Sequence, residues 1–283
     1  MPSPVISFLS DYGHADEFVG VCHGVIAKRA PSARVIDLTH SIPRHDVRAG
    51  ALVLRGTLAY TPAQVHLAVV DPEVGALGIN ARRAIALRSA AGPLLVGPDN
   101  GLLMLAAEWL GGAIEAFDIG HSPERLEPVS ATFHGRDIFA PVAAALADGA
   151  PLPGLGEPLT VEELCGLELS VAQPLHGALL THVLRCDHFG NLILDASHEQ
   201  LLAAGMRLGE ALTVEVAGGE VAGSGVAGDA HPARYASTFA DVAPGELLLY
   251  EDAQLMVALA VNRGSAAALL AVARDSELLV RRA

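Results

Sequence analysis

Two aspartates follow short apolar segments that are typical of buried strands. Asp11 comes directly after residues 5–10 (VISFLS), and Asp71 comes directly after residues 65–70 (VHLAVV). Ligands bind at the carboxyl ends of the strands in an open α/β sheet, so carboxylates in these positions can contact a substrate. An aspartate at a strand end can instead cap a helix or form a turn. Two of them, each with a glycine a few residues later, favour a binding or catalytic site.

A histidine and two arginines could complete such a site. His134 stands in TFHGRDIF, just before a predicted helix, and Arg82 and Arg83 follow the Asp71 turn. Imidazole exchanges protons near neutral pH. A guanidinium that turns inward can hold a carboxylate or orient a water. The alternatives are a histidine with ordinary surface or core contacts and a pair of solvated arginines.

A second polar cluster lies in residues 186–192 (CDHFGNL), where Asp187, Phe189 and Asn191 fall within one turn. A tight hairpin would by itself explain this composition. The same three side chains also offer a carboxylate for an ammonium group, an aromatic face for a base and an amide for the edge of a purine. Those are the groups that an adenosyl amino acid requires.

The twelve histidines raise the question of a metal site. The candidates are His182 and His188, on either side of Asp187, and the pair His40 and His45. The chain has no HExxH or HxH motif and no carboxylate–histidine group at ligand spacing. Metal sites depend on such spacings. We therefore predict that the protein holds no metal.

The elements that must position these residues alternate between strand and helix in the first half of the chain. The strands are expected at residues 5–10, 34–38, 65–70, 84–87, 94–96 and 114–119. The helices are expected after Asp16, which can cap the first of them, and at residues 46–60, 102–110 and 136–148. This alternation predicts an α/β domain with a largely parallel sheet and flanking helices.

The pattern changes after residues 150–158 (APLPGLGEP), which are rich in proline and glycine. Beyond them, strands are expected at residues 177–184, 192–194, 212–216, 246–250 and 255–261, with glycine-rich turns such as 217–228. We therefore predict an N-terminal α/β domain over residues 1–150, a linker over 151–175 and a smaller C-terminal β domain over 176–283.

Composition excludes several classes of protein. The chain has 283 residues, of which 51% are hydrophobic and 18% charged, so it is not disordered. No uncharged apolar run reaches the roughly 18–20 residues that span a bilayer. The net charge of −14 comes without a basic stripe, which argues against nucleic-acid partners. The three cysteines form no CxxC pair, so we expect free thiols and a cytoplasmic protein.

Seven ordered segments resemble the S-adenosylmethionine (SAM) hydroxide adenosyltransferases, also called SAM hydrolases. This family is related to the fluorinating and chlorinating enzymes that attack the same molecule. The resemblance runs nearly from end to end. The matching segments are residues 8–20, 36–51, 69–75 (VVDPEVG), 97–103 (GPDNGLL), 132–144, 187–192 (DHFGNL) and 260–267.

The resemblance implies a fold, an assembly and a reaction. The fold is an N-terminal α/β domain with a C-terminal β-barrel-like domain. The assembly is a homotrimer, with each active site between one chain's N-terminal domain and its neighbour's C-terminal domain. The reaction is hydrolysis of SAM to adenosine and L-methionine, in which SAM is the substrate and no cofactor takes part. Asp71, Arg82 and His134 match the set that handles the water.

The remaining matches concern substrate binding. Asp11 corresponds to the carboxylate that holds the ribose hydroxyls, and Asp187 to the residue that holds the methionine ammonium. Asn191 and the backbone near Arg263 correspond to adenine contacts. Phe189 corresponds to a ring that lies against the adenine.

Comparison with the halogenating branch favours water as the nucleophile. That branch has an aromatic residue at the position of Asp71, lacks the histidine at 134 and has a tryptophan where His45 stands. Halide transfer on the same scaffold is therefore the less favoured alternative.

This chain also departs from the family pattern. Glu73 replaces a glycine and the turn before Arg82 is about four residues longer, so Arg83 is an alternative to Arg82. Ala253 and Ala258 replace a serine and a glutamate. The altered turn leaves room for a second alternative, a non-catalytic protein that binds adenosine or SAM.

Overall fold

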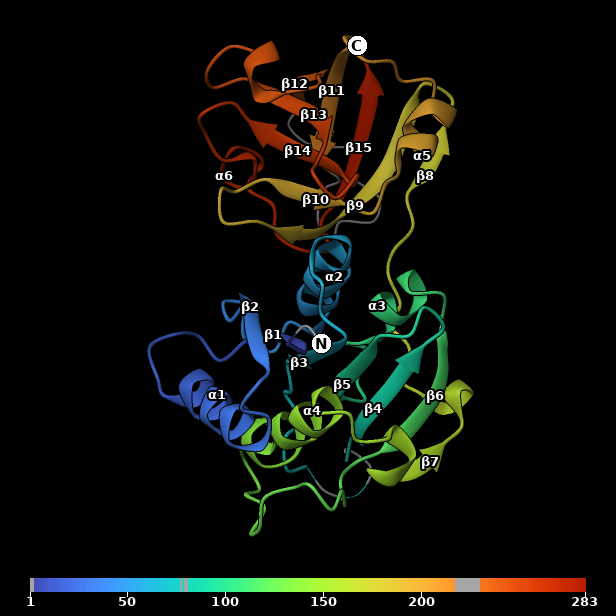
Figure 1. Ribbon diagram of the computed structural model, residues 1–283. Coiled ribbons are helices and arrows are strands. Elements are labelled where there is room, and N and C mark those ends of the chain that lie inside the picture. Colours follow the sequence, from blue (N-terminus) through green and yellow to red (C-terminus); the bar gives the residue numbers. More distant parts are fainter. Residues whose placement is uncertain (1–2, 77, 79–80, 217–229) are drawn as a thin grey trace. The chain divides into compact units, whose positions relative to one another are not determined.

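The computed structural model describes residues 3–76, 78, 81–216 and 230–283, and the chain divides into two units (Figure 1). The units are Met1–Leu167 and Glu168–Ala283. The first therefore extends beyond residue 150. Within the expected linker, β7 (Glu157–Leu159) pairs with β6 (Ala113–Asp118) as an edge strand of the N-terminal sheet. Leu152 and Leu155 are buried in the core of that unit, which explains why this proline-rich stretch belongs to it.

The N-terminal unit contains a seven-stranded sheet in the order β2-β1-β3-β5-β4-β6-β7. Its other strands are β1 (Val5–Ser10), β2 (Arg34–Thr39), β3 (Val65–Val69), β4 (Ala84–Ser89) and β5 (Leu94–Pro98). The strands β2, β1, β3 and β5 are parallel to their neighbours, and β4, β6 and β7 extend the sheet with antiparallel pairings. The prediction of an α/β domain is confirmed, and the parallel half carries both strand-end aspartates.

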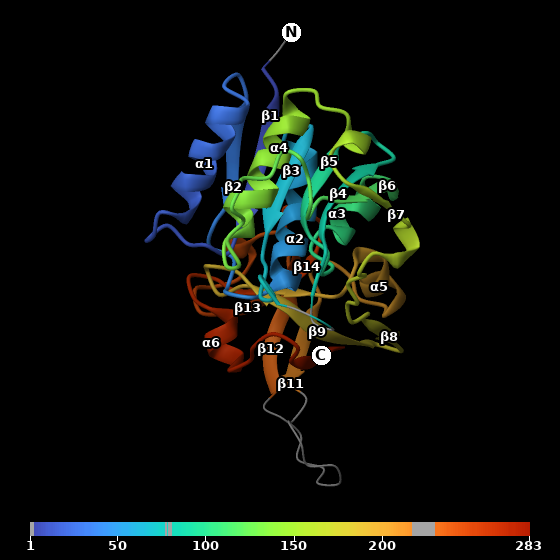
Figure 2. The same cartoon turned by 90° about the horizontal axis from the view of Figure 1, so that it is seen from below.

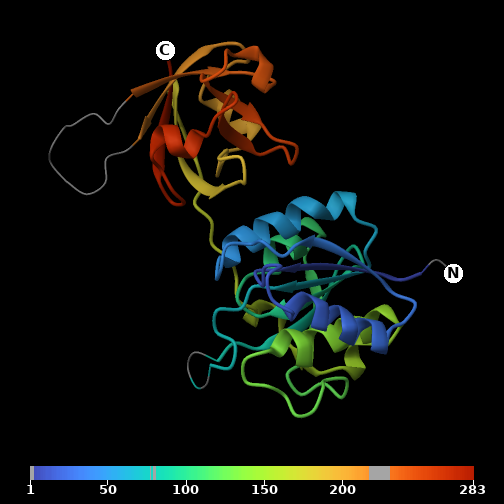
Figure 3. The same ribbon diagram turned by 90° about the vertical axis from the view of Figure 1, so that its left-hand side faces the viewer.

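Helices cover both faces of this sheet. They are α1 (Phe18–Arg29), α2 (Val47–Thr57), α3 (Met104–Trp109) and α4 (Ala140–Ala147). The face covered by α1 and α4 is turned toward the viewer in Figure 2. In Figure 3 the sheet is seen edge-on, with α2 on its opposite face. Asp46 caps α2 by accepting a hydrogen bond from the N–H of Ala49.

The expected cap of α1 is wrong. The helix begins at Phe18, and the residue at its N-cap is Glu17, whose side chain makes no capping bond. Asp16 stands one residue too early, and only the N-cap side chain reaches the free N–H groups of the first turn. The positive charges of Lys28 and Arg29 in the last turn interact favourably with the negative end of the helix dipole, which stabilises the helix.

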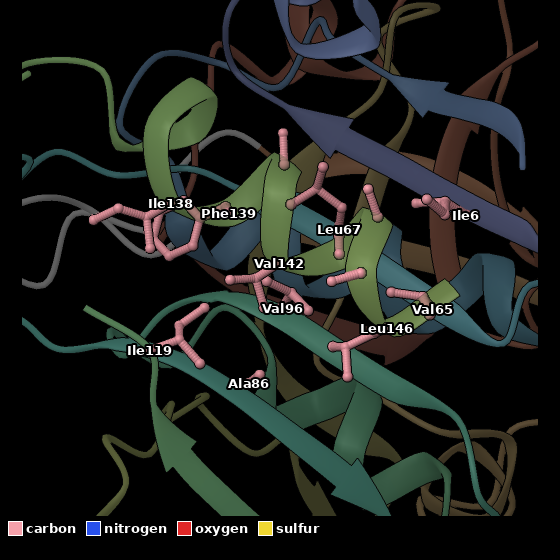
Figure 4. Packing of buried hydrophobic residues seen from close by; sticks show 14 of the residues in the cluster. Ile6, Val65, Leu67, Ala86, Val96, Ile119, Ile138, Phe139, Val142 and Leu146 are labelled. Atoms are coloured by element: carbon pink, nitrogen blue, oxygen red, sulfur yellow. The ribbon is translucent and has the colours of Figure 1, made fainter. Parts of the chain in front are cut away.

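The α4 helix lies in the largest core of the unit. Its residues from Ala140 to Leu146 are all buried, as expected for a helix that is apolar on every side. Figure 4 shows Val142 and Leu146 of this helix packed with Val65 and Leu67 of β3. Because the strand that precedes Asp71 packs against the helix that follows His134, this core brings Asp71 and His134 to the same region.

The C-terminal unit is a β-barrel. Its strands are β8 (Gln173–Leu175), β9 (Ala178–Cys186), β10 (Leu192–Leu194), β11 (Ala211–Val216), β12 (Ala230–Tyr235), β13 (Leu247–Glu251), β14 (Val257–Val261) and β15 (Glu277–Arg282). The order is β10-β14-β13-β12-β11-β15-β9-β8, and a further pairing of β10 with β9 closes seven of these strands into a ring. The expected barrel-like domain is therefore confirmed. Two short helices, α5 (His198–Ala203) and α6 (Ala266–Leu270), pack on it.

The sequence did not predict β12 and β15. β12 (AHPARY) is polar and contains Pro232, which argues against a central strand. It pairs antiparallel with β11 and parallel with β13, and β15 pairs between β11 and β9. The turn expected at residues 217–228 lies outside the described residues. No helix in the described part of the chain is long and apolar enough to cross a bilayer.

Candidate active site

Neighbouring strands bring Asp11 and Asp71 to one edge of the N-terminal sheet. β1 and β3 are parallel and in contact, with Ser10 opposite Val69 in the register. The N–H of Asp11 donates to the carbonyl of Val69 at 3.4 Å. The two aspartates therefore leave adjacent strands at the same carboxyl edge, where ligands bind in sheets of this kind.

Arg82 reaches the same edge from the other direction. It lies just before β4, which runs antiparallel to β5, so the start of β4 lies at the carboxyl edge of β5. Its Nε donates to Oδ1 of Asp71 at 2.9 Å, and its Nη2 donates to Oδ2 of the same carboxylate. The two side chains are only 5% and 6% exposed. The guanidinium also packs over the buried ring of Phe139, 5.3 Å from the centroid. A bidentate, buried pair of this kind has a fixed geometry.

Arg83 is turned to a different partner. Its Nε donates to Oδ2 of Asp99 at 2.7 Å. Consecutive residues at a strand end project to opposite sides. The structure thus brings Arg82, and not Arg83, to Asp71.

His134 completes a three-residue cluster. It precedes a π-helical turn, Gly135–Phe139, that leads into α4. Its Nδ1 lies 2.9 Å from Nη2 of Arg82. A guanidinium can only donate, so Nδ1 accepts and the proton of the neutral ring is on Nε2. Burial lowers the pKa of His134, and the positive charge of Arg82 lowers it further. The ring is therefore neutral at neutral pH.

The altered turn keeps the cluster in contact. Gly75 has φ +73°, and a Cβ there would lie 2.0 Å from the carbonyl oxygen of Ala131. The turn that carries Asp71 therefore lies directly against the segment that leads to His134. Glu73 is exposed in this turn, so its side chain does not fill the site.

Asp11 is held by the backbone. The N–H of His45 donates to Oδ2 of Asp11 at 3.0 Å, from a residue with φ +65°. The sequence grouped His45 with His40 as possible metal ligands. In the structure, the backbone of His45 binds Asp11, while Nδ1 of the buried His40 is hydrogen-bonded to Oγ of Ser10 at 2.7 Å.

The sequence analysis missed Tyr12, the residue after Asp11. A Cβ on Gly135 would lie 2.0 Å from the Tyr12 hydroxyl, so this hydroxyl reaches the backbone beside His134. Burial raises the pKa of Tyr12 well above its ordinary value, and the nearby carboxylates of Asp71 and Asp11 raise it further. Tyr12 is therefore a neutral hydroxyl beside the cluster. Its position directly after a strand-end aspartate was the available signal.

The C-terminal unit carries the other predicted residues in one pocket of about 720 Å³. Asp187, Phe189, Asn191 and Arg263 all line it. Oδ1 of Asp187 accepts from the N–H groups of Phe189 (2.8 Å) and Asn191 (2.9 Å), and its Oδ2 accepts from Nδ2 of Asn191 at 2.8 Å. The tight-hairpin interpretation and the binding interpretation thus describe the same turn.

Aromatic rings form part of the wall of this pocket. Phe189 is 75% exposed, although large apolar side chains are usually buried. Phe239, which the sequence analysis missed, also lines the pocket and contacts Tyr250 with 5.1 Å between ring centroids. Ala253, where the resemblance implies a serine, lies on the same wall. The pocket offers flat apolar faces beside a carboxylate and an amide.

Two family descriptions match the two units of the chain. The family description "SAM hydroxide adenosyltransferase N-terminal domain" matches residues 6–156, and the corresponding C-terminal domain matches residues 181–279. The chain belongs to the SAM hydroxide adenosyltransferase family. Both matched ranges contain the residues that the sequence motifs singled out.

Relatives of this SAM hydroxide adenosyltransferase family member include hydrolases and fluorinases. The chain is 49% identical over 279 residues to the (R)-S-adenosyl-L-methionine hydrolase of Salinispora tropica, covering 99% of this chain and 98% of that protein. A fluorinase from an Actinoplanes species is 29% identical over 232 residues, covering 72% of this chain and 75% of the fluorinase. A solved structure of an uncharacterised conserved protein from Thermotoga maritima superposes with a TM-score of 0.87 at 33% identity, covering 98% of this chain and all of that one.

Proposed function

We propose that this SAM hydroxide adenosyltransferase family member hydrolyses S-adenosyl-L-methionine by attack of water at the ribose 5′ carbon, giving adenosine and L-methionine. The observation that carries the proposal is the buried contact of Asp71, Arg82 and His134. The identity to relatives named (R)-S-adenosyl-L-methionine hydrolase supports it. SAM is the substrate, and the reaction needs no cofactor.

The difficult part of this reaction is the activation of the nucleophile, water. The sulfonium leaves as a neutral thioether, so the leaving group needs no acid. The water oxygen bonds to the 5′ carbon as the bond from carbon to sulfur breaks, and the electron pair goes to sulfur. One water proton must be removed. Positioning the water in line with the 5′ carbon and accepting this proton are the tasks left to the protein.

The three residues divide these tasks. Arg82 fixes the orientation of both Asp71 and His134 by donating to each of them. Each carboxylate oxygen has a second lone pair, so Asp71 can accept from the water while it is held by the guanidinium. His134 presents the protonated Nε2, because its Nδ1 already accepts from Arg82. We assign acceptance of the water proton to Asp71 and orientation of the water to His134.

Substrate binding uses both units. Asp11 holds the ribose hydroxyls, Asp187 the methionine ammonium, and Asn191, Phe189 and the backbone near Arg263 the adenine. We infer a cytoplasmic homotrimer in which one chain's N-terminal unit and its neighbour's C-terminal unit complete each site. The exposed Phe189 ring supports an assembly that covers it. Sedimentation of the purified protein measures the trimer directly.

The alternatives differ in their products. A halide enzyme would need a site for an anion, which the carboxylate of Asp71 disfavours by repulsion. Halide-free and chloride-containing incubations with SAM, followed by chromatography, distinguish the possibilities. Equal amounts of adenosine and methionine in both buffers are expected. Chloride-dependent 5′-chloro-5′-deoxyadenosine, or tight binding of adenosine with no product, would contradict hydrolysis.

Replacing Phe189 with alanine is expected to raise KM roughly ten- to hundredfold, because stacking of a base on an aromatic ring contributes about 1–3 kcal/mol. The fold of the C-terminal unit should stay intact, as measured by circular dichroism, since the ring is 75% exposed within one chain. Initial rates over a range of SAM concentrations measure the effect. Leu208→Ala, at a side chain that is 60% exposed and outside the pocket, is the matched control. An unchanged KM in Phe189→Ala would remove this residue from the adenine site.

A further inference from the structure

Three side chains outside the water-handling cluster converge on the N-terminal unit. His23 comes from α1, Asp37 from β2, and His40 from the residue after β2. Nε2 of His23 lies 2.9 Å from Oδ1 of Asp37, and Nε2 of His40 lies 3.0 Å from the same oxygen. One ligand atom from each residue lies within 4.8 Å of the others. Sequence spacing concealed this group because His23 belongs to a different element.

His40 has an unsatisfied nitrogen that points into this group. Its side chain is completely buried. The Nε2 atom is close to Oδ1 of Asp37 but has no hydrogen-bond partner of acceptable geometry among the described residues. A buried nitrogen without a partner destabilises the folded state. His23 makes an ordinary hydrogen bond to Asp37, but the contact of His40 leaves its Nε2 without a well-directed partner. An ion bound to Nε2 would supply that partner.

The surroundings of His40 suit a metal ligand. Oγ of Ser10 accepts from the N–H of Tyr12 at 3.3 Å and lies 2.7 Å from Nδ1 of His40. If Nδ1 donates to this hydroxyl, the lone pair of the ring is on Nε2. Metal-bound histidines usually donate their other ring N–H in this way. Burial lowers the pKa of His40, which keeps the ring neutral, although Asp37 works in the opposite direction.

Contrary to the sequence-based prediction that the protein holds no metal, we propose that His23, Asp37 and His40 bind a divalent transition-metal ion of the zinc class. Two imidazole nitrogens and one carboxylate oxygen favour zinc, cobalt or nickel over magnesium or calcium, which prefer oxygen. Bonds of about 2.0–2.1 Å in a tetrahedron separate ligand atoms by about 3.3 Å. The two distances to Oδ1 of Asp37, 2.9 and 3.0 Å, are slightly shorter than this, and all three ligand atoms lie within 4.8 Å of one another. The side chains of His23 and Asp37 are 35% and 41% exposed, which leaves a path from solvent and room for water as the remaining ligand.

The site would act on the fold and would not take part in the water attack. None of its ligands belongs to the cluster of Asp71, Arg82 and His134. The ion would tie α1 to β2, and through His40 and Ser10 it would also brace the end of β1 that precedes Asp11. We therefore expect metal to raise thermal stability without being required for turnover.

Titration of the tag-free protein, dialysed against a chelator and then freed of it, with ZnCl₂ in a calorimeter tests this proposal. One zinc per chain with micromolar or tighter affinity is expected, together with a rise in melting temperature. CoCl₂ should give the intense visible absorption of a tetrahedral cobalt site. Failure of the wild-type protein to bind zinc in this range would overturn the proposal.

Two variants locate the ion. His23→Gln alters a half-exposed helix residue and should keep the fold while weakening zinc binding at least tenfold. Asp37→Asn should also weaken zinc binding at least tenfold. It provides a second test if His23→Gln is unstable. His176→Gln, at an exposed histidine in the C-terminal unit, should bind zinc like the wild type. Equal zinc affinity in His23→Gln, Asp37→Asn and the wild type would place the ion elsewhere and refute the assignment.

Discussion

Asp71→Asn is expected to lower kcat by roughly 10²–10⁴, the range typical of a group that transfers a proton in the transition state. The amide has nearly the shape of the carboxylate but has only one accepting oxygen. It therefore loses one of the two bonds to Arg82 and no longer accepts a proton from water. Adenosine formation under saturating SAM measures the loss.

A neighbouring ion pair provides the matched control. Asp99 is also nearly buried, accepts from Arg83 at 2.7 Å and accepts from the N–H of Cys165 at 2.8 Å. Asp99→Asn therefore disturbs a neighbouring arginine–aspartate pair outside the cluster, and it should keep kcat near the wild-type value even if it lowers the melting temperature. Turnover of folded Asp71→Asn close to wild type would remove Asp71 from the chemistry. An equal loss in Asp99→Asn would show that the effect is structural.

His134→Gln is expected to lower kcat by roughly 10²–10⁴ and to change the pH dependence. The wild-type ring is active when neutral, because its Nδ1 must accept from Arg82. Its pKa in the folded protein is lowered from 6.5, first by burial and then by Arg82, so activity should be constant above pH 6.5 and fall as the pH is lowered through that depressed pKa. Protonation of His134 would place its positive charge beside that of Arg82.

Profiles of kcat/KM against pH, from about pH 5 to pH 9, separate this effect from others. Glutamine cannot titrate, so the residual activity of His134→Gln should lack the limb that belongs to the histidine. His121→Gln, at a histidine paired with Arg125 on the surface, is the control and should retain the wild-type profile. A wild-type rate that rises on acidification below pH 6.5, or an unchanged acid limb in His134→Gln, would contradict the assigned role.

Much of the site could be predicted because it depends on local patterns. A buried apolar run that ends in aspartate predicts both the strand and the edge at which the carboxylate lies, and β1 and β3 have this form. The hairpin of Asp187 and Asn191 is likewise local, since three hydrogen bonds within five residues define it.

The remaining features depend on contacts between distant segments. The choice between Arg82 and Arg83 follows from the side to which each residue before β4 projects, which the uncertain turn length left undetermined. The polar, proline-containing β12 is a strand only because two neighbouring strands pair with it. The group around Asp37 needs a helix residue brought to a strand.

The central claim is that water attacks the 5′ carbon of SAM, and the destination of the water oxygen tests it most directly. The protein is incubated with SAM in water enriched in oxygen-18, and the products are analysed by mass spectrometry. We expect the label in the 5′ hydroxyl of adenosine and none in methionine. Adenosine incubated without SAM controls for exchange. Label in homoserine with release of methylthioadenosine, or unlabelled adenosine, would contradict attack at the 5′ carbon.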